Sequence, residues 1–180
     1  MKKENTALYI LRLTVTLLLI CAAVAAVLAA VNAITKEPIA AIQEQKTQQA
    51  IAVVLPGAEG IEKMTLSGDT GIVSAVYAAE AGYAVEVTPG GFDGEITMMV
   101  GIADGKVTGI SVISHTETPG LGAVAAANNA KGEAFRGQFV GQTGVLSVGD
   151  QIDGMSGATI TSKAVTAGVN AALEFVENLG

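Results

Sequence analysis

The feature that most constrains this chain is a stretch of 22 residues near its amino end, Leu13 to Ile34, that carries no charged side chain. At about 1.5 Å per residue, a helix of that length is roughly 33 Å long, which matches a hydrocarbon core of about 30 Å. The stretch therefore predicts a transmembrane helix. The alternative is a cleaved signal peptide, but the apolar core of such a peptide usually runs only about 7–15 residues. Length favours a helix that stays in the membrane.

The charges on either side of this stretch predict its orientation. The first 34 residues carry a net charge of +2, from Lys2, Lys3 and Arg12 against one glutamate, and the remainder carries −9, which together make the −7 of the chain. The positive-inside rule places the amino terminus in the cytoplasm. We therefore expect a single-pass protein of the cell (inner) membrane with its acidic domain on the extracytoplasmic side. The lipid bilayer is the expected partner of the helix, since an acidic domain is not attracted to anionic lipids.

The composition excludes several functional classes. The chain has one cysteine, Cys21, and one histidine, His115, which excludes a zinc finger, a cysteine-ligated iron–sulfur cluster, a CxxCH haem site and an intrachain disulfide. Its ten Lys and Arg residues form no basic stripe, so we expect no nucleic-acid partner. No nucleophile–base pair or set of metal ligands stands out, and we predict neither catalytic residues nor a metal site. If such a chain moves electrons, it needs an organic cofactor.

The hydrophobic pattern predicts an α+β fold in three parts. Residues 1–35 form the cytoplasmic N-terminus and the transmembrane helix, residues 36–57 form an amphipathic connector helix that begins again at Pro38, and residues 58–180 form one small extracytoplasmic domain. In that domain, alternating apolar residues indicate an antiparallel sheet, flanked by helices. Within the sheet we expect Met98 in the core and Met99 at the surface.

Individual elements of the domain can be placed from the same pattern. We expect strands at 82–87, 95–102 and 106–114, one or two further strands within 61–80, a turn at 104–105, a short helix within 123–130, a strand near 145–148, and a last helix from Lys163 to Leu179.

A small-residue segment before the last helix is the first candidate for chemistry. It reads Asp153-Gly154-Met155-Ser156-Gly157-Ala158-Thr159-Ile160-Thr161-Ser162. A glycine-rich turn that opens a helix offers free backbone N–H groups and the positive end of the helix dipole, which suits a phosphate. The simpler interpretation is a capped turn, with Thr161 or Ser162 as the N-cap. Residue types and spacing alone leave both interpretations open.

Two motifs in this chain resemble those of one protein family. The string Asp153 to Thr159 resembles the D-x-x-S/T-G-A-T/S motif, at which a flavin transferase attaches FMN through a phosphoester to the final hydroxyl residue. Residues His115 to Gly122 resemble the H-x-E-T-P-G-L-G loop of the same FMN-binding domain family. With the N-terminal span, the resemblance covers nearly the whole chain. It is to the G subunit of the Rnf electron-transport complex, a membrane assembly that couples reduced ferredoxin and NAD to sodium or proton movement.

The resemblance implies a function and a cofactor. The chain would be a membrane-anchored electron carrier with covalent FMN, an electron-transfer subunit rather than an enzyme on its own, and its partners would be the other membrane subunits of the complex and the flavin transferase. Three alternatives are the C subunit of the sodium-pumping NADH:quinone reductase, which shares both motifs but usually has a longer outer domain, a flavin carrier for another extracytoplasmic reductase, and an anchored scaffold without redox function.

The resemblance also implies roles for individual residues. Thr159 would carry the FMN phosphate, and Asp153 would be recognised by the transferase. The remaining expected cofactor-binding residues are Ser156, Gly157 and Ala158 around the attachment point, and Glu117, Thr118, Gly120, Leu121 and Gly122 beside the isoalloxazine.

Overall fold

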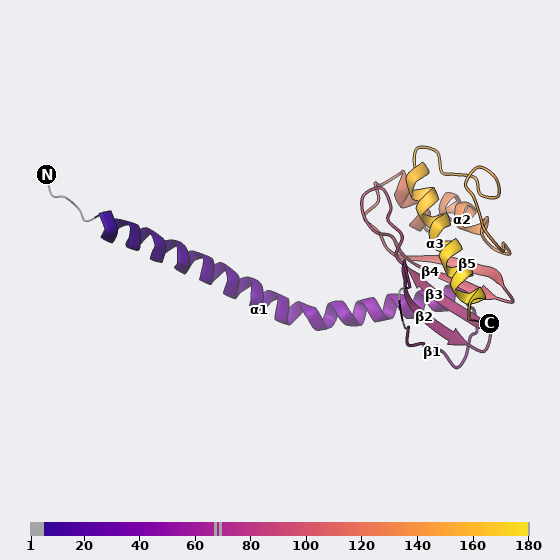
Figure 1. Ribbon diagram of the computed structural model, residues 1–180, viewed down its shortest axis with the longest axis horizontal. Coiled ribbons are helices and arrows are strands. Elements are labelled where there is room, and N and C mark those ends of the chain that lie inside the picture. The colour runs from indigo at the N-terminus through magenta and orange to yellow at the C-terminus, as the bar shows by residue number, and fades with distance from the viewer. Residues whose placement is uncertain (1–5, 67, 69, 180) are drawn as a thin grey trace. The chain divides into compact units, whose positions relative to one another are not determined.

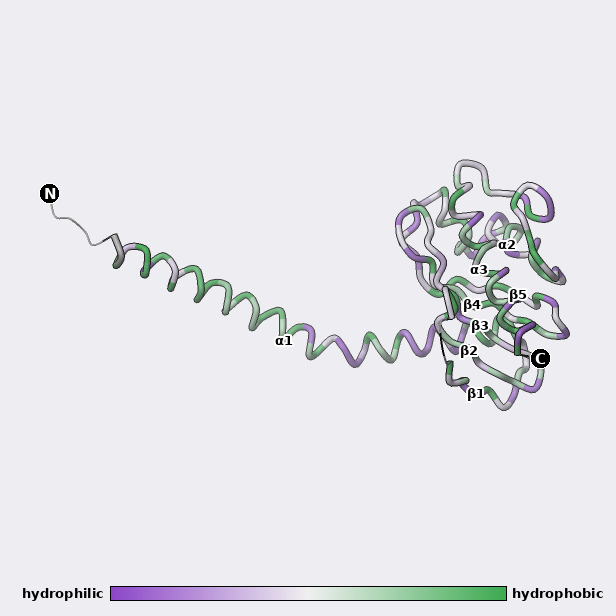
Figure 2. The backbone as a smooth tube through the Cα atoms, viewed as in Figure 1, coloured by the Kyte–Doolittle hydropathy of each residue, from purple (hydrophilic) through white to green (hydrophobic). Residues whose placement is uncertain are grey.

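The computed structural model describes residues 6–66, 68 and 70–179, which fall into two compact units, one up to Gln45 and one from Lys46 onward. The described residues of the first unit all lie in helix α1 (Thr6–Val54), which continues into the second unit. Within the described residues, α1 is the one helix long and apolar enough to cross a membrane. Its most apolar segment has a mean hydropathy of 2.7, and the rest of the described chain does not cover this segment. Figure 2 shows the hydrophobic stretch along the first part of α1 and hydrophilic residues among apolar ones along its second part.

The expected helix break at Pro38 is wrong, because α1 runs through this residue without interruption. Proline removes one backbone donor, the N–H that would bond to Ile34, but its fixed φ is compatible with a helix. The flanking turns keep their own bonds, and the Thr35 hydroxyl donates to the Val31 carbonyl at 2.9 Å. One missing bond is therefore not enough to end a helix of 49 residues.

The second unit is built on a five-stranded antiparallel sheet with its strands in chain order (Figure 1). The strands are β1 (Glu62–Lys63), β2 (Val73–Ala79), β3 (Gly82–Val87), β4 (Thr97–Ala103) and β5 (Lys106–Ser114). This confirms the predicted α+β class and the antiparallel sheet. The turn between β4 and β5 has Asp104 and Gly105 at φ 52° and 71°, the pair of positive angles that a two-residue hairpin turn requires.

Each face of the sheet is covered by a different helix. On one face, Val85, Met98 and Val100 pack with the apolar side of α3 (Thr159–Glu177). On the other face, Met99 packs with Ile51 at the end of α1. The prediction that Met99 lies at the surface is wrong: its side chain is fully buried. Because two layers cover the sheet, β4 is buried on both faces, and an alternating pattern cannot reveal a second covering helix that comes from elsewhere in the chain.

The segment between β5 and α3 contains the short helices η1 (Gly122–Ala126) and α2 (Ala130–Gly137). Helix η1 confirms the short helix expected in this region, as a 3-10 helix. The strand expected near Val145–Val148 is absent from the described chain, where only an isolated bridge joins Val148 to Ile152. Instead, the Asn170 amide of α3 satisfies both the N–H and the carbonyl of Leu146 at 2.9 Å. A side chain thus takes the place of a neighbouring strand.

Helix α3 begins earlier than expected, at Thr159, and its N-cap is Ala158 rather than Thr161 or Ser162. Both hydroxyl residues lie inside the first turn of α3 and are buried, with exposures of 1% and 0%. The Ser162 hydroxyl accepts the Met155 N–H at 2.9 Å and donates to the Ala158 carbonyl at 2.9 Å. It therefore holds the preceding loop against the helix rather than capping the helix.

Candidate functional site

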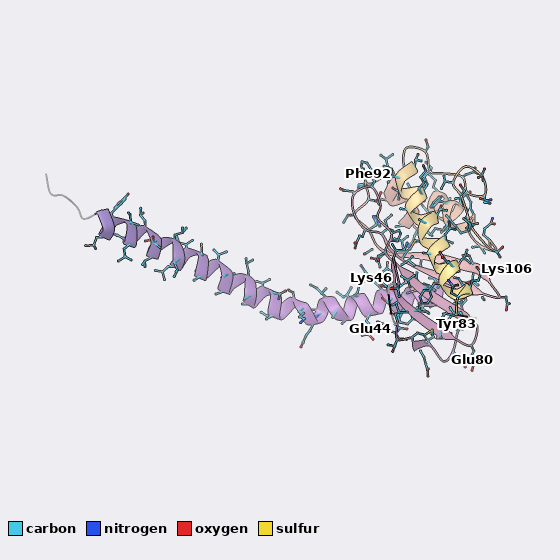
Figure 3. The ribbon with its side chains drawn as sticks, viewed as in Figure 1. Glu44, Lys46, Glu80, Tyr83, Phe92 and Lys106 are labelled. Carbon is cyan, nitrogen blue, oxygen red and sulfur yellow. The ribbon has the colours of Figure 1, made fainter. Side chains whose placement is uncertain are left out.

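A cleft of about 320 Å³ lies where three segments that are distant in the sequence meet. The segments are the loop around Phe92, the loop that follows β5, and the first turn of α3. Figure 3 shows Phe92 at the opposite end of the domain from Tyr83 and Glu80. The volume falls within the range of about 300–1,000 Å³ that is typical of small-molecule sites. The cleft is lined by Phe92, Glu117, Thr118, Leu121, Gly122, Gly157, Ala158, Thr159, Ile160 and Thr161.

The Glu117 carboxylate joins the three segments. One of its oxygens accepts the N–H groups of Phe92 at 2.7 Å and Asp93 at 3.3 Å, and the other accepts the Thr161 hydroxyl. The side chain is only 5% exposed, and burial of a charged group is costly unless hydrogen bonds compensate for lost water. Here three donors compensate, so that one carboxylate fixes both loops on the start of α3.

The same contacts decide the ionisation of Glu117. Burial alone raises the pKa of its carboxyl group, but the hydrogen bonds from Thr161, Asp93 and Phe92, with a further contribution from the charge of His115, bring the pKa below its ordinary value. Hydrogen bonds to the charged form favour that form. Glu117 is therefore an ionised acceptor at neutral pH rather than a proton donor.

Two glycines allow the loops to close on Glu117. A side chain at Gly91 would collide with one carboxylate oxygen of Glu117. A side chain at Gly122 would collide with the other oxygen and with the Thr161 hydroxyl. Glycine is required at both positions because the backbone approaches the carboxylate too closely for a β-carbon.

Thr159 is the first residue of α3, is exposed, and lines the cleft. No side chain caps the start of this helix, and its first turn contains no acidic residue. The first backbone N–H groups of a helix have no partner within it, and together with the helix dipole they attract an anion. The Thr159 hydroxyl group thus lies at a helix start whose first backbone N–H groups are not capped by a side chain.

The structure brings most of the predicted cofactor residues together. Seven of them line the cleft, namely Glu117, Thr118, Leu121, Gly122, Gly157, Ala158 and Thr159. Ser156, Gly120 and Asp153 do not line it, and all three are exposed. Gly120 has φ 78° and open space where a side chain would be, so its glycine serves the turn itself.

Three further lining residues are not predicted by the sequence motifs: Phe92, Ile160 and Thr161. Phe92 lies 25 positions before Glu117, and its loop is held at the cleft by the bonds from the Phe92 and Asp93 N–H groups to the Glu117 carboxylate and from the Thr116 hydroxyl to the Asp93 carbonyl. Its signal in the sequence is a single aromatic residue within the glycine-rich stretch Gly90 to Gly94.

The lining fits a flavin mononucleotide. Phe92, Leu121 and Ile160 are 67%, 45% and 52% exposed, which supplies the apolar surface that a flat aromatic ring system needs in order to leave water. The uncapped first turn of α3 suits the phosphate at the other end of such a ligand. The apolar side chains that line the cleft and the free N–H groups at the start of α3 therefore match a molecule with one apolar, planar end and one anionic end.

Comparison with known proteins agrees with this interpretation of the site. Residues 91–174 match the FMN-binding domain family. Over 98% of this chain and 96% of the relative, the sequence is 36% identical to the G subunit of the proton-translocating ferredoxin:NAD(+) oxidoreductase complex of Clostridium ljungdahlii. It is 33% identical to the G subunit of the ion-translocating oxidoreductase complex of Methanosarcina acetivorans, over 93% and 94% of the two chains. It is also 33% identical to the G subunit of the Na(+)-translocating ferredoxin:NAD(+) oxidoreductase complex of Acetobacterium woodii, over 94% and 93%.

The fold, the cleft and the match over residues 91–174 together define an FMN-binding domain, which here follows one long apolar helix. The relatives match along nearly their whole length as well as nearly all of this chain. The chain belongs to the family of G subunits of Rnf-type ion-translocating ferredoxin:NAD oxidoreductase complexes. This confirms the resemblance that the two motifs indicated.

Proposed function

We propose that this protein is a membrane-anchored electron carrier of an Rnf-type complex and that it carries FMN covalently on Thr159. The observation that supports this most strongly is the position of Thr159. Its hydroxyl-bearing side chain is exposed, borders the cleft and begins an uncapped helix, within the motif that resembles a flavin attachment sequence. When bound, FMN supplies the transfer of one or two electrons, and the protein supplies position and electrostatics.

The attachment is a group transfer without redox change. The Thr159 oxygen forms a bond to the phosphorus of the FMN moiety, and the bond between that phosphorus and a leaving phosphate breaks. The base of the transferase accepts the proton of the Thr159 hydroxyl, and the second phosphate leaves as part of the departing nucleotide. The donor must carry the FMN phosphate in activated form, and a flavin dinucleotide such as FAD does so because its two phosphates share an anhydride bond. The acceptor protein contributes an uncrowded hydroxyl, and the flavin transferase contributes the base.

The residues of the cleft then hold the cofactor. The apolar side chains of Phe92, Leu121 and Ile160 would shield the isoalloxazine from water, and the backbone N–H groups at the start of α3 would bind the phosphate. Glu117 would line the site while its carboxylate holds the two loops in place. Covalent attachment makes sense for a domain outside the cytoplasm, since a dissociated flavin would be lost there.

The charge distribution supports the orientation. The residues before the apolar stretch are net positive and those after it are net negative, so we propose that the amino terminus is cytoplasmic and the FMN-binding domain extracytoplasmic. The partners in this proposal are the other membrane subunits of the complex. Isolation of the intact membrane complex and identification of its neighbouring subunits tests this assignment. Co-purification with the subunits of an unrelated reductase would contradict it.

The covalent attachment can be tested with the full chain expressed together with a flavin transferase. Flavin fluorescence should remain on the protein band after a denaturing gel, and mass spectrometry should find FMN on the peptide that contains Thr159. Thr159→Ala should abolish the fluorescence. Thr159→Ser is the matched control, because it keeps a hydroxyl group and should retain the flavin.

Either of two results would overturn the attachment site. The first is a Thr159→Ala band as bright as that of the wild type. The second is an unmodified peptide containing Thr159 in protein isolated from its natural host, which would favour a scaffold without redox function.

A further inference from the structure

The loop that leads to Thr159 is held by a side chain that lies outside the attachment motif. Gln138 is the C-cap residue of α2. Its amide oxygen accepts the Asp153 N–H at 2.7 Å, and its amide nitrogen donates to the Asp153 carbonyl at 3.3 Å. Both backbone groups of Asp153 are thus bound by one side chain 15 positions earlier in the chain. No sequence pattern connects these two residues.

The far end of the same loop is also fixed. Ser162 bonds to the Met155 N–H and the Ala158 carbonyl, each at 2.9 Å, and is fully buried. Between these two anchors lies Gly154, where a β-carbon would come within 3.1 Å of the Val148 side chain. The loop from Asp153 to Ala158 is therefore held by side-chain hydrogen bonds at both ends.

The Asp153 side chain is left free by this arrangement. It is exposed, and it takes part in no hydrogen bond or ion pair within the part of the chain that the structure describes. Gln138 uses only the backbone of Asp153, so the carboxylate remains available to a partner. A buried or paired carboxylate in this position would have indicated a structural role instead.

We propose that Gln138 is a positioning residue for flavin transfer: it presents the Asp153 carboxylate and the following loop in the conformation that the flavin transferase binds. This inference rests on the proposed attachment of FMN to Thr159 and deepens it. The partner it addresses is the transferase, a protein that must approach the exposed loop with a cationic group for Asp153 and an activated flavin phosphate for Thr159.

The proposal predicts a particular kinetic signature. If only a fraction of the acceptor molecules has the loop in the competent conformation, the apparent Kd for the transferase equals the intrinsic Kd divided by that fraction. The rate of the chemical step within the complex is unchanged. Loss of both bonds from Gln138 should lower the competent fraction about tenfold, the order expected for two neutral hydrogen bonds. The KM for the acceptor protein should therefore rise about tenfold, with kcat changed less than about twofold.

The experiment uses the full chain in detergent micelles, a purified flavin transferase and FAD, with the rate of FMN attachment followed by mass. Gln138→Met keeps the length and packing of the side chain but removes both bonds. Gln142→Met is the matched control, because Gln142 is a nearby amide that bonds to the Gln138 carbonyl at 3.2 Å and not to Asp153. We expect the raised KM in Gln138→Met and a wild-type KM in Gln142→Met.

Hydrogen exchange provides a second measurement that does not depend on a variant. In the wild-type chain without flavin, the Asp153 N–H should exchange slowly, as expected for a bonded amide in a preformed loop. Fast exchange at Asp153 would overturn the proposal, and so would equal KM values in Gln138→Met and the wild type. If the wild-type chain gains no FMN at Thr159, the attachment itself fails and this inference fails with it. Normal attachment with no effect of Gln138→Met overturns the inference alone.

Discussion

Helices α2 and α3 lie in the same domain but begin in opposite ways. The start of α2 is closed: the Asn129 side chain accepts the N–H groups of Lys131 and Gly132 at 3.1 and 3.0 Å, and Glu133 lies in the first turn. The start of α3 has Ala158 as its N-cap, no capping side chain and no acid in its first turn. Capping groups and first-turn acids both stabilise a helix. The start of α2 is thus stabilised by a capping side chain and an acidic residue, whereas the start of α3, where we expect a phosphate to bind, has neither.

The open start of α3 is supported from outside the helix. Glu117 bonds to Thr161 and to the loop around Phe92, and Ser162 holds the loop before the helix. These bonds engage side chains of the first turn and leave the backbone N–H groups of Thr159, Ile160 and Thr161 available. The contrast teaches that a binding site can keep a helix start open when its neighbours hold the helix in place.

The largest expected effect follows from removal of the support. Glu117→Ala should lower the free energy of unfolding by about 1–3 kcal/mol, because it leaves the buried Thr161 hydroxyl and the part-buried N–H groups of Phe92 and Asp93 without an acceptor. Chemical denaturation of the full chain in detergent measures this change. Glu133→Gln, in the exposed first turn of α2, is the control and should change stability by less than about 0.5 kcal/mol. Equal losses in the two variants would contradict the special role of Glu117.

The same carboxylate gives the stability a defined pH dependence. The folded-state pKa of Glu117 lies below its ordinary value of about 4.3, so its contribution is fully present above that ordinary value and is lost as the pH falls through the folded-state pKa. Glu117→Gln should therefore flatten the decline in stability on acidification. Denaturation curves at a series of pH values between about 7 and 2 provide the test, since the wild type should lose more stability than the variant over that range.

An acid added to α3 would make its start resemble that of α2. Ile160→Glu should slow FMN attachment about tenfold, because a carboxylate in the first turn repels the incoming phosphate, while the helix dipole stabilises the protein by up to about 1 kcal/mol. Ile160→Gln is the matched control, since it removes the same apolar surface without adding charge. If both variants accept FMN at the same rate, the anion-binding role of this helix start is wrong.

The smallest expected effect comes from opening the start of α2. Asn129→Ala should cost about 1 kcal/mol of stability, the usual loss for an N-cap, and should leave the amount of FMN on Thr159 unchanged. Thermal unfolding and in-gel fluorescence measured on the same sample check both parts. A loss of flavin in this variant would mean that the two helix starts are coupled, contrary to the comparison.

Much of the fold could be predicted because it depends on local pattern. Strand β5 has the predicted bounds, Lys106 to Ser114, and the Asp104–Gly105 turn forms as expected. The failed predictions for Met99 and for the segment near Leu146 share one cause, which is the influence of residues far away in the chain. Met99 is buried by the end of α1. The backbone groups of Leu146 form their hydrogen bonds with the Asn170 side chain and not with a neighbouring strand. Periodicity reports which residues are apolar but not which distant element covers them.

The candidate site shows the same division. Residue type and order are enough to reveal the uncharged stretch that can span a membrane, the presence of only one cysteine and one histidine, and the Thr159 hydroxyl in its small-residue motif. The tertiary structure alone decided that Glu117 is a buried junction, that Phe92 borders the cleft and that Gln138 holds Asp153. Each of these depends on a hydrogen bond or contact between residues 15 or more positions apart, and such contacts form only when the whole domain packs.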